Sequence, residues 1–168
     1  MLLELLLLLL AVPTSACDAA HAGPELDGAH VSLTGLLVIG GHTASLVEPG
    51  KSPDCSVFPI FSGTPVFEIP DISEKGLMNT PRINRFLDGY LEHLRTNRGH
   101  VRLVTFRGIL KVRPSLTVDD RLNRGDGYGH RGLWRVGLIV QDIEDVTCVE
   151  PSTWIRWRTS GQLWHSGY

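Results

Sequence analysis

The sequence predicts a small domain that is mainly β (α+β), with one helix set among its strands. Most apolar stretches are short and alternate with polar residues, which is typical of half-buried strands. Only the segment that follows Pro81 repeats its apolar residues at three- and four-residue steps, as a helix does. The chain has 168 residues, 42% of them hydrophobic and 20% charged. A length of that order supports one buried core.

Three short strands are expected in the first half of the domain. The first covers 31–39, and a pair of glycines then turns the chain back into a second strand over 44–47. The third strand covers 57–61. Pro59 lies inside it and favours a position at the edge of a sheet, because proline donates no hydrogen bond to a neighbouring strand.

The single helix is predicted to begin at Pro81. Its apolar face consists of Ile83, Phe86, Leu87, Tyr90, Leu91 and Leu94. Thr80 suits the N-cap position, and proline suits the first turn. Gly99 lies just past the expected end, where a left-handed residue is common. Gly89 weakens the helix interior by roughly 1 kcal/mol relative to alanine.

Two longer strands complete the domain, over 101–112 and 134–146. Alternation in the first of them places Thr105 and Arg107 on one face, and Gly108 indicates a bulge. The order is therefore three strands, a helix and two strands. This is the chain order of a small OB-like five-stranded barrel with one helix between strands 3 and 4.

The first residues of the chain predict export. Residues 1–16 combine an apolar run, too short to span a bilayer, with a small-residue segment, as a secretory leader does. The segment before the run contains an acidic residue and no basic side chain, which leaves a buried N-terminal helix as the alternative. Cleavage is expected after Ala16 or Ala22. The four residues that end at Cys17 also resemble a bacterial lipobox, which would make this cysteine a lipidation site.

Beyond the leader, we expect a flexible tether over 17–29, the β domain over 30–149 and a poorly ordered tail over 150–168. The expected locations are the periplasm, the membrane surface through a lipid anchor, or the medium. Membrane contact is expected only through the leader or the lipid.

The chain has three cysteines, Cys17, Cys55 and Cys148. If Cys17 carries lipid or leaves with the leader, the other two remain as a candidate disulfide for an oxidising compartment. Two unrelated buried thiols are the alternative, because sequence does not establish geometry.

Charge divides the chain into two unequal halves. Residues 17–81 hold two basic and eight acidic side chains, whereas residues 82–135 hold twelve basic and five acidic ones. A basic half is typical of an anion-binding face, of a surface that packs on the acidic half, or of a solvated surface.

The candidate ligand-binding residues come from this basic half. They are Arg102, Phe106, Arg107, Lys111, His130 and Trp134. OB-like barrels bind oligosaccharides or single strands with aromatic platforms and basic residues. One aromatic on the fourth strand is too few for a row of stacked bases. We therefore expect an envelope ligand or protein, and no nucleic acid.

A catalytic constellation is not evident in the sequence. The histidines show no metal-ligand spacing, the serines show no nucleophile elbow, and no cofactor or metal is expected. The glycine-rich run 127–132 fits a dinucleotide fingerprint in letters only, because a strand and not a helix is expected after it. One alternative function is a small hydrolase or metal-dependent enzyme built on the 119–130 loop, from Asp119, Asp120, Asp126 and His130. The other is oligosaccharide or oligonucleotide binding on the OB face.

Three segments share a pattern: the first strand from Val31 to Leu37, the later strand from Val104 to Leu110, and the segment Gly129-His130-Arg131-Gly132-Leu133-Trp134. Together they resemble small exported bacterial proteins that have an OB-like domain. The resemblance implies export and the barrel fold, and implies no particular activity. A non-enzymatic exported domain that binds or scaffolds an envelope component is therefore the expected function.

Overall fold

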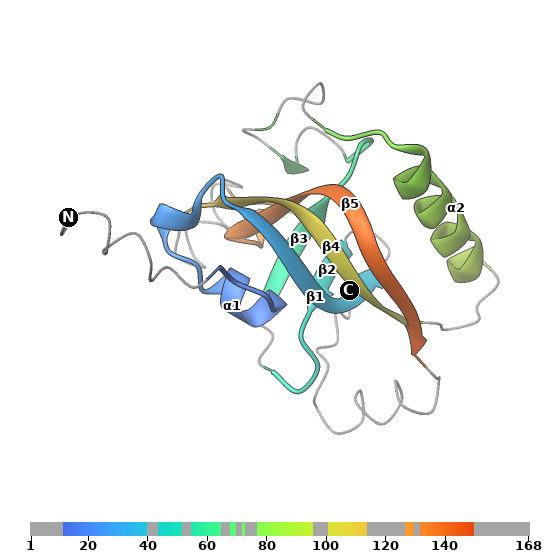
Figure 1. The fold of residues 1–168 in the computed structure, drawn as a ribbon, viewed down its shortest axis with the longest axis horizontal. Coiled ribbons are helices and arrows are strands. Elements are labelled where there is room, and N and C mark those ends of the chain that lie inside the picture. The colour runs from blue at the N-terminus through green and yellow to red at the C-terminus, as the bar shows by residue number, and fades with distance from the viewer. Residues whose placement is uncertain are drawn as a thin grey trace, which may run out of the picture.

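The computed structural model describes residues 12–39, 44–51, 55–64, 68–69, 72, 77–95, 101–113, 127–129 and 132–149. Its elements in chain order are α1 (Ala16–Ala20), the 3₁₀ turn η2 (Pro24–Leu26), β1 (His30–Ile39), β2 (Ala44–Val47), β3 (Ser56–Ile60), α2 (Pro81–Arg95), β4 (Val101–Val112) and β5 (Val136–Val149) (Figure 1). Within this described part of the chain, no helix is both long enough and apolar enough to cross a membrane.

The five strands close into a barrel in the order β1-β2-β3-β5-β4. β3 and β5 run parallel, and every other neighbouring pair is antiparallel. In the chain, α2 lies between β3 and β4. The predicted mainly β fold, a small five-stranded barrel with a helix between strands 3 and 4, is confirmed.

The barrel interior is filled by alternating side chains of the strands and by one face of α2. Phe106 of β4 is fully buried at its centre. The rings of Phe61 and Phe86 meet Phe106 edge-on, at centroid distances of 5.6 and 5.9 Å. Ile83 of α2 is also fully buried in this cluster. The predicted apolar stripe of the helix therefore closes the core, as far as the side chains of α2 are described.

A second, smaller cluster covers the outer side of β3. Phe58 and Ile60 point away from the barrel interior and pack with Ile69, Tyr128 and Trp134. The backbones of Tyr128 and Trp134 exchange two hydrogen bonds, of 2.7 and 3.1 Å. The segment before β5 thus folds back over the barrel and hides apolar side chains that β3 would otherwise expose.

β3 is not an edge strand, which corrects the expectation drawn from Pro59. β2 pairs with β3 only at Ser56 and Val57, whereas β5 pairs with it from Phe58 to Ile60. Pro59 therefore lies beyond the last pairing with β2, so its missing amide removes no hydrogen bond on that side.

The irregularity expected at Gly108 lies on the partner strand. The register between β4 and β5 shifts on both sides of the Phe106–Arg107 pair, and the extra residues, Glu144 and Gln141, belong to β5. Gly108 has a different role, because a Cβ at this position would collide with the carbonyl oxygen of Ile139. Glycine allows the two strands to approach closely where the barrel bends.

The segment 17–29 is packed against the barrel, which corrects the expected flexible tether. Its small residues let the backbone approach the core, and Ala19, Ala20 and Ala22 are all buried. Gly28 donates to the Leu110 carbonyl at 2.8 Å, and Leu110 donates to Ala29 at 2.9 Å. The small residues of this segment therefore belong to a closely packed part of the chain, which their composition alone does not distinguish from a loose linker.

β5 begins two residues later and ends three residues later than predicted. The leader up to residue 11, the 119–126 acidic segment, His130 and the tail from residue 150 lie outside the described residues. The expectations for these segments remain predictions.

The two glycines Gly108 and Gly89 give opposite expectations for substitution by alanine. Gly108→Ala should lower the free energy of unfolding by about 2 kcal/mol, because the strands must move apart. Gly89→Ala should raise it by up to about 1 kcal/mol, because a methyl group there meets nothing within 4 Å and alanine favours the helix. Urea denaturation followed by circular dichroism measures both changes, and a Gly108→Ala protein as stable as the unmodified one would contradict the close approach.

Candidate functional site

The outer face of β1, β4 and β5 carries two adjacent rows of hydrogen-bonding side chains. In one row the register places Ser32 beside Arg107 and Arg107 beside Asp142. In the other it places Thr34 beside Thr105 and Thr105 beside Asp145. We call these residues the polar face: Ser32, Thr34, Thr105, Arg107, Asp142 and Asp145. It is a direct product of strand alternation, because paired residues point to the same side of a sheet.

Hydrogen bonds and ion pairs involve four residues of the polar face: Thr34, Thr105, Arg107 and Asp142. The hydroxyl oxygens of Thr34 and Thr105 are 2.9 Å apart, within hydrogen-bond distance. Arg107 donates to one carboxylate oxygen of Asp142 at 3.1 Å, while the Ile143 amide donates to the other at 2.8 Å. Arg82 of α2 approaches the same carboxylate at 3.6 Å. Hydroxyl, guanidinium and carboxylate groups are thus presented together.

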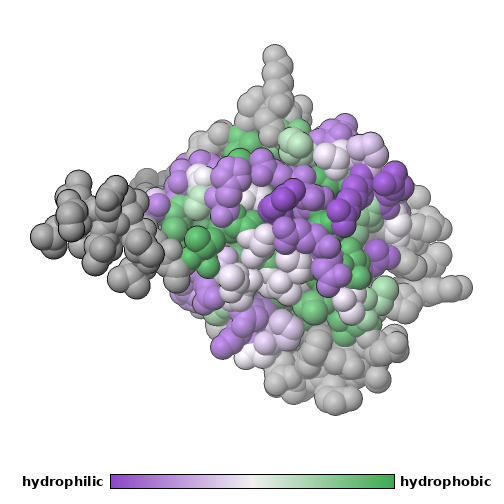
Figure 2. Space-filling model, in the orientation of Figure 1, coloured by the Kyte–Doolittle hydropathy of each residue, from purple (hydrophilic) through white to green (hydrophobic). Residues whose placement is uncertain are grey.

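These charged groups remain open to solvent. The side chains of Arg82 and Arg107 are 57% and 55% exposed. Ion pairs this exposed contribute little to stability, typically less than about 1 kcal/mol. Figure 2 shows hydrophilic residues gathered across the side of the molecule on which β4 and β5 are drawn in Figure 1. The polar face is therefore a surface available for binding.

The structure separates the six sequence-predicted ligand residues. Phe106 is fully buried in the core, and Trp134 is buried against Phe58 with its indole nitrogen donating to Ser56 at 3.1 Å. Arg102 lies over the ring of Phe86, 5.7 Å from its centroid. Phe106, the candidate aromatic residue of the fourth strand, is therefore part of the interior.

Arg107 belongs to the polar face, whereas Lys111 pairs with Asp27 at 3.0 Å. His130 lies outside the described residues. The sequence-based set missed the hydroxyl and carboxylate members of the face. Their signal was present in the alternation of Thr105 with Phe106, but the pairing of β4 with β1 and β5 was needed to bring them together.

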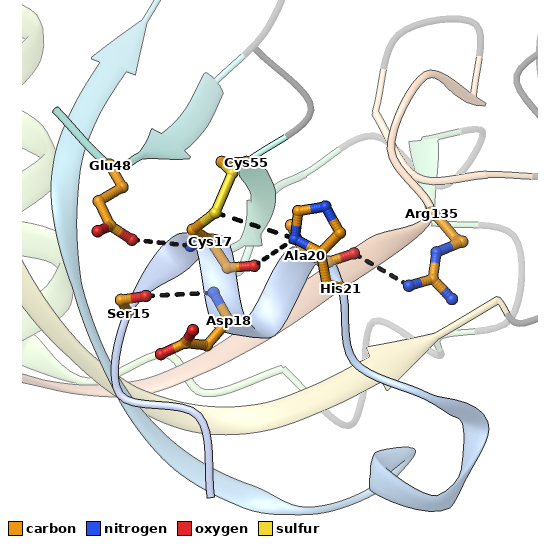
Figure 3. Close-up of a disulfide and its surroundings, with 8 residues drawn as sticks. All are labelled: Ser15, Cys17, Asp18, Ala20, His21, Glu48, Cys55 and Arg135. Carbon is orange, nitrogen blue, oxygen red and sulfur yellow. Dashed lines mark hydrogen bonds between the residues drawn. A yellow bond between two sulfur atoms is a disulfide. The ribbon is translucent and has the colours of Figure 1, made fainter. Parts of the chain in front are cut away.

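A second group of reactive side chains lies where α1 meets β3. Cys17 forms a disulfide with Cys55, which directly precedes β3. The backbone amide of Cys17 donates to a carboxylate oxygen of Glu48 at 3.2 Å. His21 lies one helical turn after Cys17, and its Nδ1 is 2.9 Å from the Cys17 carbonyl oxygen and 3.9 Å from the sulfur. Figure 3 shows the imidazole beside the disulfide.

This disulfide corrects two expectations from the sequence. Cys55 pairs with Cys17 and not with Cys148, which is an exposed free thiol near the end of β5. The sulfur of Cys17 is already bonded, so it carries no lipid in this structure. The packing of α1 on the barrel brings Cys17 to Cys55. This contact was not predicted, because a flexible tether was expected where α1 lies.

Both ends of α1 are held by side chains. The Ser15 hydroxyl accepts a hydrogen bond from the Asp18 amide at 3.1 Å, as an N-cap does. At the other end, Arg135 donates to the carbonyl oxygens of Ala20 and Ala22 at 3.0 and 2.8 Å. A cation at a helix C-terminus satisfies the last carbonyl groups and opposes their partial negative charge.

Comparisons of the chain with protein-family models, with curated proteins and with solved structures give no match.

Asp27 joins the segment after η2 to the end of β4. Burial works to raise its pKa, but the hydrogen bond from the Val112 amide at 2.8 Å opposes this. The hydrogen bond and charge of Lys111, with the charge of Arg113, add to that opposition, and the pKa of Asp27 lies below its usual value. The ionised carboxylate is thus the form that the fold stabilises.

Asp27→Asn should lower stability at neutral pH by roughly 0.5–1 kcal/mol, because the carboxylate is partly exposed and its ion pair is screened. A lowered folded pKa gives a contribution that is present above the unfolded value of about 3.9 and is lost as the pH falls through the folded pKa. The difference from the unmodified protein should therefore shrink below about pH 4. Thermal unfolding between pH 3 and 7 measures it, with the exposed Asp88→Asn as control. A difference that stays constant over this range would contradict the assignment.

Proposed function

We propose that this chain is an exported, non-enzymatic binding domain whose ligand is an envelope glycan held at the polar face. The observation that carries glycan binding is the pair of cross-strand rows of hydroxyl, guanidinium and carboxylate groups. Sugar hydroxyl groups both donate and accept hydrogen bonds, so they match a surface that offers both kinds of partner.

The disulfide supports export. Disulfides persist in oxidising compartments and are rare in the cytosol. Cys17 closely follows the apolar leader, and its pairing with Cys55 joins the first helix of the domain to β3. The apolar leader and the disulfide are independent properties of the chain, and both favour an oxidising compartment outside the cytoplasm.

The packing of the N-terminal segment bears on where the leader would be cleaved. Cleavage after Ala22 would remove all of α1 together with Cys17. Cleavage after Ala16 would remove Ser15, which caps α1, and the Thr14 carbonyl, which accepts from the Thr34 amide at 3.1 Å. We propose cleavage after Ala16, because of the two expected sites it is the one that keeps Cys17 and its disulfide in the mature chain.

Nucleic acid is disfavoured as the ligand. Single-stranded nucleic acids stack their bases on exposed aromatic side chains. Among the described residues, the large apolar side chains that are exposed are Val12, Met78 and Val146, none of them aromatic. The acidic Asp142 and Asp145 would also repel a phosphate backbone from the polar face. The same carboxylates serve as hydrogen-bond acceptors for sugars.

Export is tested by the mass and thiol count of the chain produced with its leader in a bacterium. The chain recovered from outside the cytoplasm should begin at Cys17. It should alkylate once before reduction, at Cys148, and at all three cysteines afterwards. A Cys55→Ser variant is the control and should alkylate twice without reduction. Full-length cytoplasmic protein with three reactive thiols would contradict export, and a mature chain that begins at Gly23 would contradict the retained helix.

Glycan binding is tested by co-sedimentation with purified peptidoglycan and by titration with its soluble fragments. Arg107→Ala should weaken binding at least tenfold, because it removes a charge-assisted hydrogen bond worth about 1.5–3 kcal/mol. Thr105→Val should weaken it less, since it deletes one hydroxyl and keeps the side-chain shape. The matched control is Arg85→Ala, an exposed arginine of α2. Equal binding by all variants, or tighter binding of a single-stranded oligonucleotide, would overturn this ligand assignment.

A further inference from the structure

The three residues Cys17, His21 and Cys55 form a cluster of metal-ligating groups. One potential ligand atom from each lies within 4.8 Å of the other two. Cys17 and His21 are four residues apart, a spacing that places side chains on the same side of a helical turn. Cys55 approaches from the start of β3, on a different element. Two segments of the chain therefore supply two sulfur atoms and one imidazole to the same place.

The spacing of the Cys17 sulfur and the His21 Nδ1 suits a shared ion. Metal–sulfur bonds of about 2.3 Å and metal–nitrogen bonds of about 2.0 Å place a sulfur and a nitrogen roughly 3.5–3.8 Å apart in tetrahedral or trigonal geometry. The Cys17 sulfur and the His21 Nδ1 are 3.9 Å apart. These two ligands therefore need almost no rearrangement to share an ion.

The hydrogen bonds around His21 allow its Nδ1 to leave the Cys17 carbonyl oxygen and bind a metal ion instead. The Cys17 carbonyl oxygen lies 2.9 Å from Nδ1 and also accepts from the His21 amide at 3.2 Å. If Nδ1 turns to a metal ion, the carbonyl keeps its backbone donor. The imidazole is exposed, so a proton carried on Nε2 would face water.

One acidic side chain lies beside the cluster, and the cluster is open to solvent on one side. Glu48 places a carboxylate oxygen 3.2 Å from the Cys17 amide. Cys55 is 5% exposed and Cys17 is half-buried, so the sulfur atoms are shielded on the barrel side while the side occupied by His21 remains open. An ion can thus enter from solvent and bind against a buried wall.

We propose that, when the disulfide is reduced, Cys17, His21 and Cys55 bind one thiophilic metal ion, Cu(I) or Zn(II). A dithiol reductant supplies two electrons and two protons to the disulfide, gives two thiols, and is itself oxidised to a disulfide. Binding of the ion displaces the two thiol protons to solvent and forms two metal–thiolate bonds and one metal–imidazole bond. Thiolate ligands select these ions over harder ones. Metal binding at this cluster is independent of glycan binding at the polar face.

The test uses the full domain, reduced under anaerobic conditions and titrated separately with Cu(I) and Zn(II) against a chromophoric chelator. We expect one tightly bound ion per reduced chain and none per oxidised chain. His21→Ala should weaken binding at least tenfold, and Cys55→Ser should abolish competition with the chelator. The controls are Cys148→Ser, which removes the free thiol, and His30→Ala, which removes another exposed histidine. Neither should change the affinity.

Circular dichroism of the reduced protein and of His21→Ala establishes that the fold is retained, and the exposed position of His21 makes unfolding of this variant unexpected. Tighter binding of one of the two ions identifies the metal that the site prefers. The proposal is overturned if the reduced chain binds neither ion stoichiometrically, if His21→Ala binds as tightly as the unmodified chain, or if binding depends on Cys148.

Discussion

The close pairing of β4 with both of its neighbours is the constraint on which the rest of the structure depends. β4 pairs with β1 over eight residues and with β5 over its full length, so its alternation decides what faces inward on three strands at once. Phe106 points inward and packs against the other aromatic rings of the core, while Thr105 and Arg107 point outward and belong to the polar face. A slip of one residue would exchange these two sets. The contact of Gly108 with the backbone of Ile139 fixes that register where the barrel bends.

α1 packs on the same barrel, but it is held there by other interactions than strand pairing. Alanine side chains allow the helix to lie directly against the strands, and Arg135 satisfies the carbonyl groups at its end. The Cys17–Cys55 bond closes a loop with a sequence separation of 38 residues. The chain-entropy estimate for such a loop is about 4 kcal/mol. Covalent, packing and polar contacts therefore hold one short helix that would not be stable alone.

The barrel could be predicted from the sequence because each strand carries its own period and turn signals, and because one amphipathic helix stood between the third and fourth strands. The N-terminal segment could not, since alanine and glycine are equally typical of a loose linker and of tight packing. The position of Pro59 shows a related limit: its neighbours depend on how far β2 extends, which no local pattern encodes.

The same distinction explains why the candidate sites were only partly predicted. Arg107 could be identified because its charge stands out within its own strand. Thr34 and Asp142 could not be identified, because each belongs to the polar face only through a hydrogen bond to a residue more than thirty positions away in the chain. In the sequence alone, Cys17 stands out only as a residue that follows the leader. Because a flexible tether was expected over 17–29, the helical turn that brings Cys17 close to His21 was not predicted. Chemistry that is assembled across elements depends on the fold that assembles it.

The cluster at α1 links the redox state of the chain to its stability. Reduction opens the covalent loop between Cys17 and Cys55, and the unfolded chain then regains the conformational freedom that the disulfide had removed. A metal ion held by the same two sulfur atoms closes the same loop, and it binds the folded state preferentially because only folding brings His21 to both cysteines. The buried alanines and Arg135 keep α1 in place during the exchange. The domain would therefore remain cross-linked under oxidising conditions by sulfur alone, and under reducing conditions by sulfur and metal together.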